Sequence, residues 1–349
     1  MAEADLPMVS VIAPCRNEVL FIEKAIRTIL ENDYPTELIE LLVIDGMSTD
    51  GTREIVGRMA EHDERIRLLD NPKKIVPSAM NIGIKASQGE YILRIDCHST
   101  FASNYISKCI ELSRRTCADN VGGYIITLPG ADTRIAKAIM AATSSKFGVG
   151  NSTFRLSGPE QEAETVPFGT FRRNLFDKIG LYDERLVRNQ DIELNSRIRK
   201  AGGRIVISPD IRVNYYNRAT YSGLWRQSFN NGLWNPYTIW LTGGGLALRH
   251  FIPMFFVIGL FTLSLCAVFQ PPVKWVLLGY ILVYLCSAGF FSIKHTRRNK
   301  ILSILVLWSY IVLHISYGFG SLCGLITIPL KFPCRDKNIS NEGPVEGTA

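Results

Sequence analysis

The stretch YILRIDCHST, residues 91–100, begins as an apolar strand and then stops on a carboxylate and an imidazole two residues apart. Residues 91–95 have the character of a buried strand. Asp96 and His98 are residue types that either form a polar turn or hold a metal ion. A polar loop after a strand is the simpler interpretation, and half of a metal site is the alternative. The strands around this stretch bear on the choice.

Apolar runs and helical periodicity alternate before this stretch. Strands are expected at 8–14, 39–45 and 66–69, and helices are expected through Ile22–Leu30, over 48–62 and over 77–86. This alternation predicts βαβ units, hence an α/β fold with a mostly parallel sheet and helices on both of its faces. The residues that follow the strands are PCRNE, DGMSTDGT and DCHST. Ligands of such sheets bind at the carboxyl ends of the strands.

Several classes of protein are disfavoured by missing motifs. No Gly-x-Gly-x-x-Gly follows the first strand and no Walker A sequence occurs, which argues against a dinucleotide-dependent dehydrogenase and a P-loop ATPase. No Cys-x-x-Cys occurs, so a zinc ribbon or a dithiol redox site has no support. The net charge of +7 suits an anionic partner, whether nucleic acid, a phosphorylated ligand or a membrane surface.

The last third of the chain has a different composition. Three runs without Asp, Glu, Lys or Arg, at 251–269, 275–293 and 301–326, are each about as long as a membrane-spanning helix. We therefore expect a catalytic domain over 1–220, an interfacial linker over 221–250, a membrane domain of about three helices over 251–330, and a tail over 331–349. The polar stretch 143–165 is expected to be an irregular loop.

Basic residues predict the orientation in the membrane. Arg249 and His250 precede the first run, and Lys294, Arg297, Arg298 and Lys300 follow the second, so both places should face the cytoplasm. This predicts a multi-pass protein of the inner (plasma) membrane with a cytoplasmic catalytic domain. The third run is rich in glycine and contains His314, so either a full span or a half-helix at the interface is possible. An odd number of spans would place the basic residues Lys331, Arg335 and Lys337 outside, against their charge.

Four motifs in order carry a family resemblance. VSVIAPCRNE (9–18), VIDGMSTDGT (43–52), NIGIKASQGEYILRID (81–96) and DIELNSRIRKAG (191–202) resemble family 2 glycosyltransferases with the GT-A fold, over roughly residues 7–235. Within that family the chain looks like the membrane-bound subgroup of succinoglycan and exopolysaccharide biosynthesis. The resemblance implies a glycosyltransferase (hexosyltransferase) whose sheet binds a nucleotide-diphospho-sugar.

The resemblance also implies a metal and a base. The family's Asp-x-Asp metal motif corresponds to Asp96-Cys97-His98, and the expected cofactor is Mn²⁺ or Mg²⁺. His98 replaces an oxygen ligand by nitrogen, which should weaken Mg²⁺ more than Mn²⁺. Asp191 matches the family's general base, while Gln190 stands where the family usually has Glu. A helix-capping role for Asp191 is the structural alternative.

Binding of the nucleotide and its phosphates is expected from residues spread along the same motifs. Asp45 could instead form an Asx-turn, Glu18 could serve the first turn of the following helix, and the basic residues could be solvated surface. The expected set comprises Pro14, Arg16, Glu18, Asp45, Lys74, Asp96, Arg172 and Arg226.

The resulting prediction is an inverting, metal-dependent transfer of hexose from a nucleotide sugar, expected to be UDP-linked. The expected acceptor is a polyprenyl-linked saccharide, with membrane lipids as further partners and no nucleic acid. A polyprenyl-phosphate glycosyltransferase is one alternative. The other is a membrane-bound nucleotide-sugar-binding protein without catalysis, which the His-for-Asp and Gln-for-Glu departures suggest.

Overall fold

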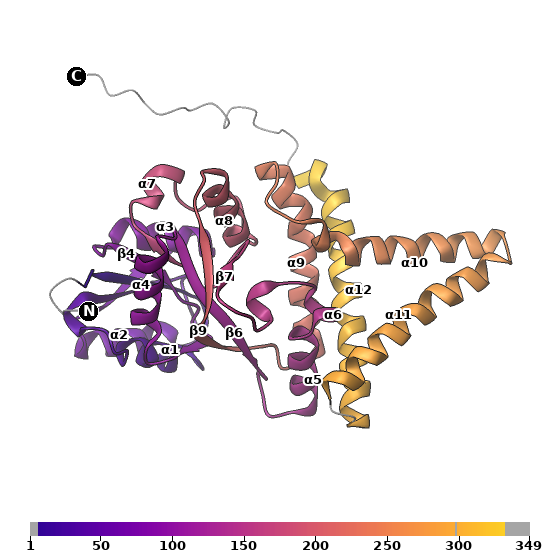
Figure 1. The fold of residues 1–349 in the computed structure, drawn as a ribbon, viewed down its shortest axis with the longest axis horizontal. Helices are drawn as coiled ribbons and strands as arrows, with labels where there is room; N and C mark the ends of the chain where they lie inside the picture. The colour runs from indigo at the N-terminus through magenta and orange to yellow at the C-terminus, as the bar shows by residue number, and fades with distance from the viewer. Residues whose placement is uncertain (1–5, 297–298, 332–349) are drawn as a thin grey trace, which may run out of the picture.

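A mixed β-sheet covered by helices forms the first part of the molecule in the computed structural model, which describes residues 6–296 and 299–331 (Figure 1). The strand order is β3-β2-β1-β4-β8-β6-β9-β5, with β7 paired to β9. The first four strands along this order are parallel. Their bounds are Val9–Cys15 for β1, Ile39–Asp45 for β2, Ile66–Asp70 for β3 and Tyr91–Arg94 for β4. The predicted α/β fold class is confirmed.

Beyond β4 the sheet is mixed rather than parallel. β8 (Thr170–Arg172) runs antiparallel between β4 and β6 (Asn120–Leu128), whereas β6 and β9 (Ile205–Tyr216) are parallel. β5 (Ser99–Phe101) and β7 (Gln161–Glu162) pair antiparallel with β9. The sequence pattern that predicts parallel strands ends near residue 96, and strands as short as β8 carry too few residues for a visible alternation.

Helices cover the two faces of the sheet because side chains alternate along each strand. Leu41 and Val43 pack into one core, and Leu42 and Ile44 into the other. The first core includes residues of α1 (Ile22–Leu30), α2 (Thr52–His62) and α4 (Tyr105–Thr116). The second includes residues of α3 (Val76–Ala86), α7 (Leu175–Ile179) and α8 (Gln190–Lys200).

The stretch 143–165 contains more secondary structure than the expected irregular loop. It begins at the end of α5 (Arg134–Thr143) and continues through α6 (Lys146–Val149), the 3₁₀ turn η3 (Thr153–Arg155) and β7. Ser145 caps α6, since its side chain accepts a hydrogen bond from the Gly148 amide, and it also accepts one from the Tyr310 hydroxyl of the last long helix. Tertiary contacts of this kind are not visible in a local sequence pattern.

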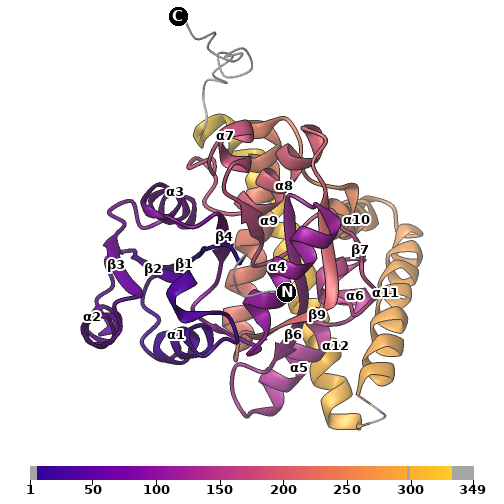
Figure 2. The same cartoon turned by 60° about the vertical axis from the view of Figure 1, so that its left-hand side comes forward.

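A long helix, α9 (Tyr221–Thr242), lies along the last helix, α12 (Lys300–Lys331), in both views (Figures 1 and 2). Glycine allows the close approach of the two backbones: a Cβ on Gly320 would lie 2.1 Å from the Phe229 carbonyl oxygen, and one on Gly232 2.0 Å from that of Tyr317. The glycine-rich part of the third apolar run is therefore a continuous helix with a packed face.

Two further helices, α10 (Ile252–Phe269) and α11 (Val273–His295), project as a hairpin from the side of α12 (Figure 1). Within the described residues, three helical segments are long and apolar enough to cross a membrane: Leu248–Phe269, Val273–His295 and Lys300–Lys331. The first of these begins with the 3₁₀ turn η4 (Leu248–Phe251). Arg297, Arg298 and the expected tail after Lys331, including Arg335 and Lys337, lie outside the described residues. The four-part domain division stays a prediction.

Candidate active site

The polar ends of three neighbouring strands meet at one edge of the sheet. β1 pairs in parallel with both β2 and β4, with Cys15 opposite Asp45 and Ile12 opposite Arg94. Parallel strands place their carboxyl ends together, so the loops after β1, β2 and β4 lie around the position where a sheet of this kind is expected to bind its ligand, here called the crevice. Asp45, Asp96 and His98 therefore lie at the same edge, as the sequence predicts for a ligand-binding crevice.

A buried arginine joins Asp96 to Asp191. One terminal nitrogen of Arg94 lies 3.0 Å from an oxygen of Asp96, and the other contacts the carboxylate of Asp191. Arg94 is 6% exposed, whereas both carboxylates are partly accessible. Asp191 is in the first turn of α8, two residues after Asn189, which occupies the N-cap position with a φ of 62°. The two residues that the family resemblance assigns to metal and base are thus on either side of one guanidinium.

Arg94 is a residue that the sequence reasoning missed. The sequence does contain a sign of its importance, which is a charged residue within the apolar strand YILR. A buried charge requires partners, so such a residue is expected to form ion pairs. Burial disfavours the charged form of Arg94, but Asp191 and Asp96 raise its pKa, so the guanidinium stays protonated. Nε of the same guanidinium and Oε1 of Gln190, the residue before Asp191, are buried without a hydrogen-bond partner among the described residues. A bound polar ligand or a water molecule would satisfy such atoms.

The two carboxylates differ in their electrostatics. Burial raises the pKa of Asp191, Asp96 raises it further, and Arg94 opposes both; the pKa lies above the usual aspartate value. Burial also acts to raise the pKa of Asp96, but Arg94 and His98 together hold it below its usual value. Groups whose environments push their pKa values apart are typical of acid–base sites. Asp191 is the one of the two with the properties of a proton acceptor.

His98 is held by a carboxylate and an aromatic ring. Its Nδ1 lies 3.3 Å from Oε1 of Glu18, in the loop after β1. Its ring packs edge-on against Tyr215 of β9, with 5.2 Å between the centroids. Burial would lower the pKa of His98, but Glu18 and Asp96 raise it above its usual value. Glu18, which was expected to bind the nucleotide, therefore lies beside the predicted metal ligand.

The residues predicted to bind a metal show one feature that is common in metal sites. A metal-binding histidine commonly gives its other ring nitrogen to a carboxylate, and Glu18 makes this contact with Nδ1 of His98. Mg²⁺-type sites commonly use one or two protein carboxylates together with substrate phosphates and water. Within residues 6–296 and 299–331, no group of three or more His, Cys, Asp or Glu is arranged to hold a metal ion. Binding of a cation by Asp96 and His98, shared with a diphosphate, therefore stays a prediction.

Asp45 has its carboxylate committed to the β2–α2 loop. It is fully buried and accepts hydrogen bonds from the Ser48 amide and hydroxyl and from Arg53, the last at 2.7 Å. Burial would raise the pKa of Asp45, but these hydrogen bonds lower it below its usual value. The contact with Ser48 is the turn that was considered as the alternative to nucleotide binding. Arg53, which also pairs with Asp70, was not foreseen.

The loops after β1 and β3 lie next to Asp45. Asn17 connects the first loop to the second: its amide donates to the Ser48 hydroxyl, and its side chain accepts from the Thr49 amide. The exposed Arg16 lies against Gly46, and the Pro14 carbonyl accepts a contact from the Cys97 thiol. On the other side of β2, the Asn71 amide donates to the Asp45 carbonyl, and the exposed Lys74 follows within the same turn. Pro14, Arg16 and Lys74 are thus at the same edge of the sheet as Asp45.

Two predicted arginines are not brought to this crevice by contacts. Arg172 lies opposite Tyr91, the first residue of β4, because β8 runs antiparallel to β4. Asp96 is five residues further along, roughly 16 Å at the usual strand rise. Arg226 is exposed on α9. Its neighbour Gln227 contacts the Tyr215 hydroxyl at 3.5 Å and so lies closer to His98. The local sequence pattern does not show which of Arg226 and Gln227 faces the candidate site.

Comparison with known proteins identifies relatives of the chain. Residues 10–180 match the model of the protein family described as "Glycosyl transferase family 2". The chain is 36% identical to the succinoglycan biosynthesis protein ExoA of Rhizobium meliloti over 224 residues, which cover 64% of this chain and 67% of that protein. It is 28% identical over 233 residues to the dolichyl N-acetyl-alpha-D-glucosaminyl phosphate 3-beta-D-2,3-diacetamido-2,3-dideoxy-beta-D-glucuronosyltransferase of Methanococcus voltae, covering 64% of this chain and 71% of that one.

A solved structure shares the fold. The mannosyltransferase PcManGT from Pyrobaculum calidifontis, in complex with GDP-Man and Mn²⁺, superimposes with a TM-score of 0.56 at 18% sequence identity. The match covers 93% of this chain and 88% of that one. The shared architecture confirms the GT-A fold.

Proposed function

Because this chain belongs to glycosyl transferase family 2 and is a glycosyltransferase related to exopolysaccharide biosynthesis, we propose that it transfers a hexose from a nucleotide sugar to a lipid-linked saccharide. The transfer is metal-dependent and inverts the anomeric centre. The observation that carries this proposal is the contact of Asp96 and Asp191 with the same guanidinium. It supports one site in which the diphosphate end of the donor and the acceptor hydroxyl meet.

Asp191 acts as the general base in this proposal. It takes a proton from the acceptor hydroxyl, whose oxygen attacks the anomeric carbon from the face opposite the leaving nucleotide. General-base assistance of this kind contributes roughly 10²- to 10⁴-fold in rate. Arg94 holds the Asp191 carboxylate in place and opposes the rise of its pKa that burial causes. The base therefore stays ionised at a higher fraction than burial alone would allow.

Asp96 and His98 would hold the divalent cation. When bound, the cation would supply positive charge to the donor diphosphate as negative charge develops there. Two contacts orient these side chains: Arg94 pairs with Asp96, and Glu18 contacts His98. The loops after β1 and β3, with Arg16 and Lys74, line the nucleotide side of the crevice. Asp45 supports that side indirectly by fixing the β2–α2 loop.

A lipid-linked acceptor is supported by two observations. The archaeal relative is named for a reaction on a dolichyl-linked sugar phosphate. This chain also continues from its catalytic part into three helices that are apolar enough to span a membrane. A cytoplasmic, multi-pass enzyme of the inner membrane would have its donor site in the compartment where nucleotide sugars are made and its acceptor in the adjacent leaflet.

The helices support a specific orientation. The hairpin of α10 and α11 projects away, whereas α12 lies along α9 beside the catalytic part (Figures 1 and 2). A third of the most apolar window of α12 is buried within the molecule (33%), against 6% and 11% for the other two segments. We infer that the hairpin inserts and returns while α12 lies at the interface. In this proposal Arg249, Lys294 and Lys331 are all on the cytoplasmic side, which is the side that their charge favours.

The experiment is a transfer assay with membranes that contain the protein. Radiolabelled UDP-glucose, UDP-galactose and GDP-mannose are supplied separately, and the lipid extract is sorted after mild acid hydrolysis. We expect label from one donor in a lipid-linked oligosaccharide. Label released as a single sugar from a sugar–phosphate bond would instead indicate direct glycosylation of polyprenyl phosphate. Absence of both transfer and donor hydrolysis in the purified protein would refute the enzymatic proposal.

A further inference from the structure

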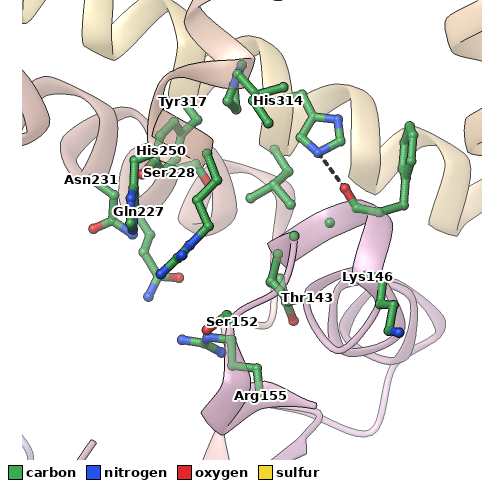
Figure 3. A pocket seen from close by; sticks show the side chains of 18 of the residues that line it. Thr143, Lys146, Ser152, Arg155, Gln227, Ser228, Asn231, His250, His314 and Tyr317 are labelled. Carbon is green, nitrogen blue, oxygen red and sulfur yellow. Dashed lines mark hydrogen bonds between the residues drawn. The ribbon is translucent and has the colours of Figure 1, made fainter. Parts of the chain in front are cut away.

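We propose that the cavity between the 143–155 segment and helices α9–α12 binds the acceptor lipid, with its apolar tail against the membrane helices and its phosphate beside Arg155. The cavity has a volume of about 580 Å³, within the usual range of small-molecule sites. Figure 3 shows Gln227, Ser228 and Asn231 on one side, Thr143, Ser152 and Arg155 on the other, and His314 at the far end. This inference rests on the proposed glycosyl transfer.

The far end of the cavity is apolar. Its lining includes side chains from each of the three candidate membrane segments, among them Phe256, Phe291 and Leu313. His314 adds little polarity, because Nε2 contacts the Phe147 carbonyl at 3.1 Å (Figure 3) and Nδ1 contacts the Tyr284 hydroxyl at 3.0 Å. With both ring nitrogens occupied, this end presents mainly carbon surface, which suits a hydrocarbon chain and not a free sugar.

The end of the cavity opposite His314, called the near end, carries a cation without a carboxylate partner. The guanidinium of Arg155 lies 5.4 Å from the ring centroid of Phe154 and 5.8 Å from that of Tyr215. Among the described residues, no Asp or Glu forms an ion pair with it. The other arginine of the lining, Arg249, is paired with Glu164. A partly buried arginine with aromatic contacts and no counter-ion is suited to a phosphate.

The near end also connects to the candidate active site. Tyr215, which contacts Arg155, packs against the imidazole of His98. The lining includes Ile192, the residue after the proposed base Asp191. A lipid whose phosphate lies beside Arg155 would therefore extend its saccharide toward Asp191. The cavity has the polarity of such a lipid: apolar at the membrane helices and cationic next to the site of transfer.

Photolabelling tests this placement. Full-length protein in lipid nanodiscs is exposed to a polyprenyl phosphate that carries a diazirine on its tail, and labelled peptides are mapped by mass spectrometry. We expect label in residues 146–155 and near Leu313. Unlabelled polyprenyl phosphate should compete, whereas polyprenol without phosphate and inorganic phosphate should each compete at least roughly tenfold more weakly. Equal competition by inorganic phosphate, or label confined to the outer faces of α10 and α11, would overturn the inference.

Two variants and two controls sharpen the test. Arg155→Gln removes the cation, and Val149→Trp reduces the space; each should weaken probe binding roughly tenfold or more. Arg58→Gln, on the exposed face of α2, and Leu278→Trp, on the exposed face of α11, should bind like the wild type. Wild-type affinity in both cavity variants would overturn the inference. A matching thermal midpoint shows that each variant is folded.

The two proposals can fail separately. Sugar transfer to lipid without label in the cavity would leave the proposed function standing and remove this inference. If the cavity is labelled in a way that requires Arg155 but the protein transfers no sugar, the lipid site would stand and the proposed function would fall.

Discussion

Arg94 and Asp191 form an ion pair across 97 residues of sequence, at the edge of the sheet where β4 ends. The same guanidinium contacts Asp96, so Arg94 separates the proposed metal ligand from the proposed base. Without this shared cation, the neighbouring carboxylates of Asp96 and Asp191 would disfavour each other's ionisation. Arg94 therefore allows both to be charged in one crevice and fixes where each one lies.

Removal of Arg94 should affect both folding and catalysis. Arg94→Met leaves two partly buried carboxylates without their cation, and we expect a loss of about 3 kcal/mol in the free energy of unfolding together with loss of transfer. Adding Asp191→Asn should restore part of the stability but no activity. Thermal melts and transfer assays measure the two effects. Arg27→Met, on the exposed surface of α1, is the control and should leave the melting midpoint unchanged. Equal stability of Arg94→Met and wild type would show that the pair is unimportant.

The pH profile should report the environment of Asp191. The base must be deprotonated, so kcat/KM should fall as the pH drops through its pKa. Since burial and Asp96 raise that pKa above the usual aspartate value, activity should fall at a higher pH than for an exposed aspartate. Arg94 opposes this shift, so Arg94→Gln should move the acid limb to still higher pH in whatever activity remains. A limb that moves to lower pH in this variant would contradict the assigned electrostatics.

The first hundred residues allowed the four parallel strands β1 to β4 to be predicted, because each of them is a mainly apolar run followed by polar residues. Asp96, His98 and Asp191 could be selected from their motifs. Arg94 could not be assigned a role, since its partner lies on a helix whose docking position is not local information. Arg172 resembled a phosphate ligand by composition, but the antiparallel register of β8 places it opposite Tyr91. The glycines of α12 allowed either a break or a close packing, and only the contact with α9 distinguishes these.

Metal preference should follow from the imidazole at position 98. Chelation should abolish transfer, and Mn²⁺ should restore more activity than Mg²⁺, because nitrogen is a poorer ligand for Mg²⁺ than oxygen. His98→Asp supplies an oxygen ligand, so the ratio of Mg²⁺- to Mn²⁺-supported activity should rise. Steady-state assays over both metal concentrations measure this ratio. Full activity in the presence of chelator would show that transfer does not require a metal.

The orientation of α12 leads to a topological prediction. If α12 lies at the interface beside α9, the end of α12 at Lys331 is on the same side of the membrane as the catalytic part. Reporters fused at the N-terminus and after Lys331 should both be active as cytoplasmic reporters and both be protected from protease in sealed cells. A reporter after Lys331 on the opposite side would instead show that α12 crosses the bilayer.

The proposed base is tested most directly by Asp191→Asn in the purified protein, with nucleotide-sugar binding and sugar transfer measured on the same preparation. Asp177→Asn, an exposed carboxylate on α7, serves as the matched control and should behave as the wild type. We predict that Asp191→Asn binds the donor with wild-type affinity and transfers sugar roughly 10²- to 10⁴-fold more slowly. Transfer by Asp191→Asn at the wild-type rate would contradict the account.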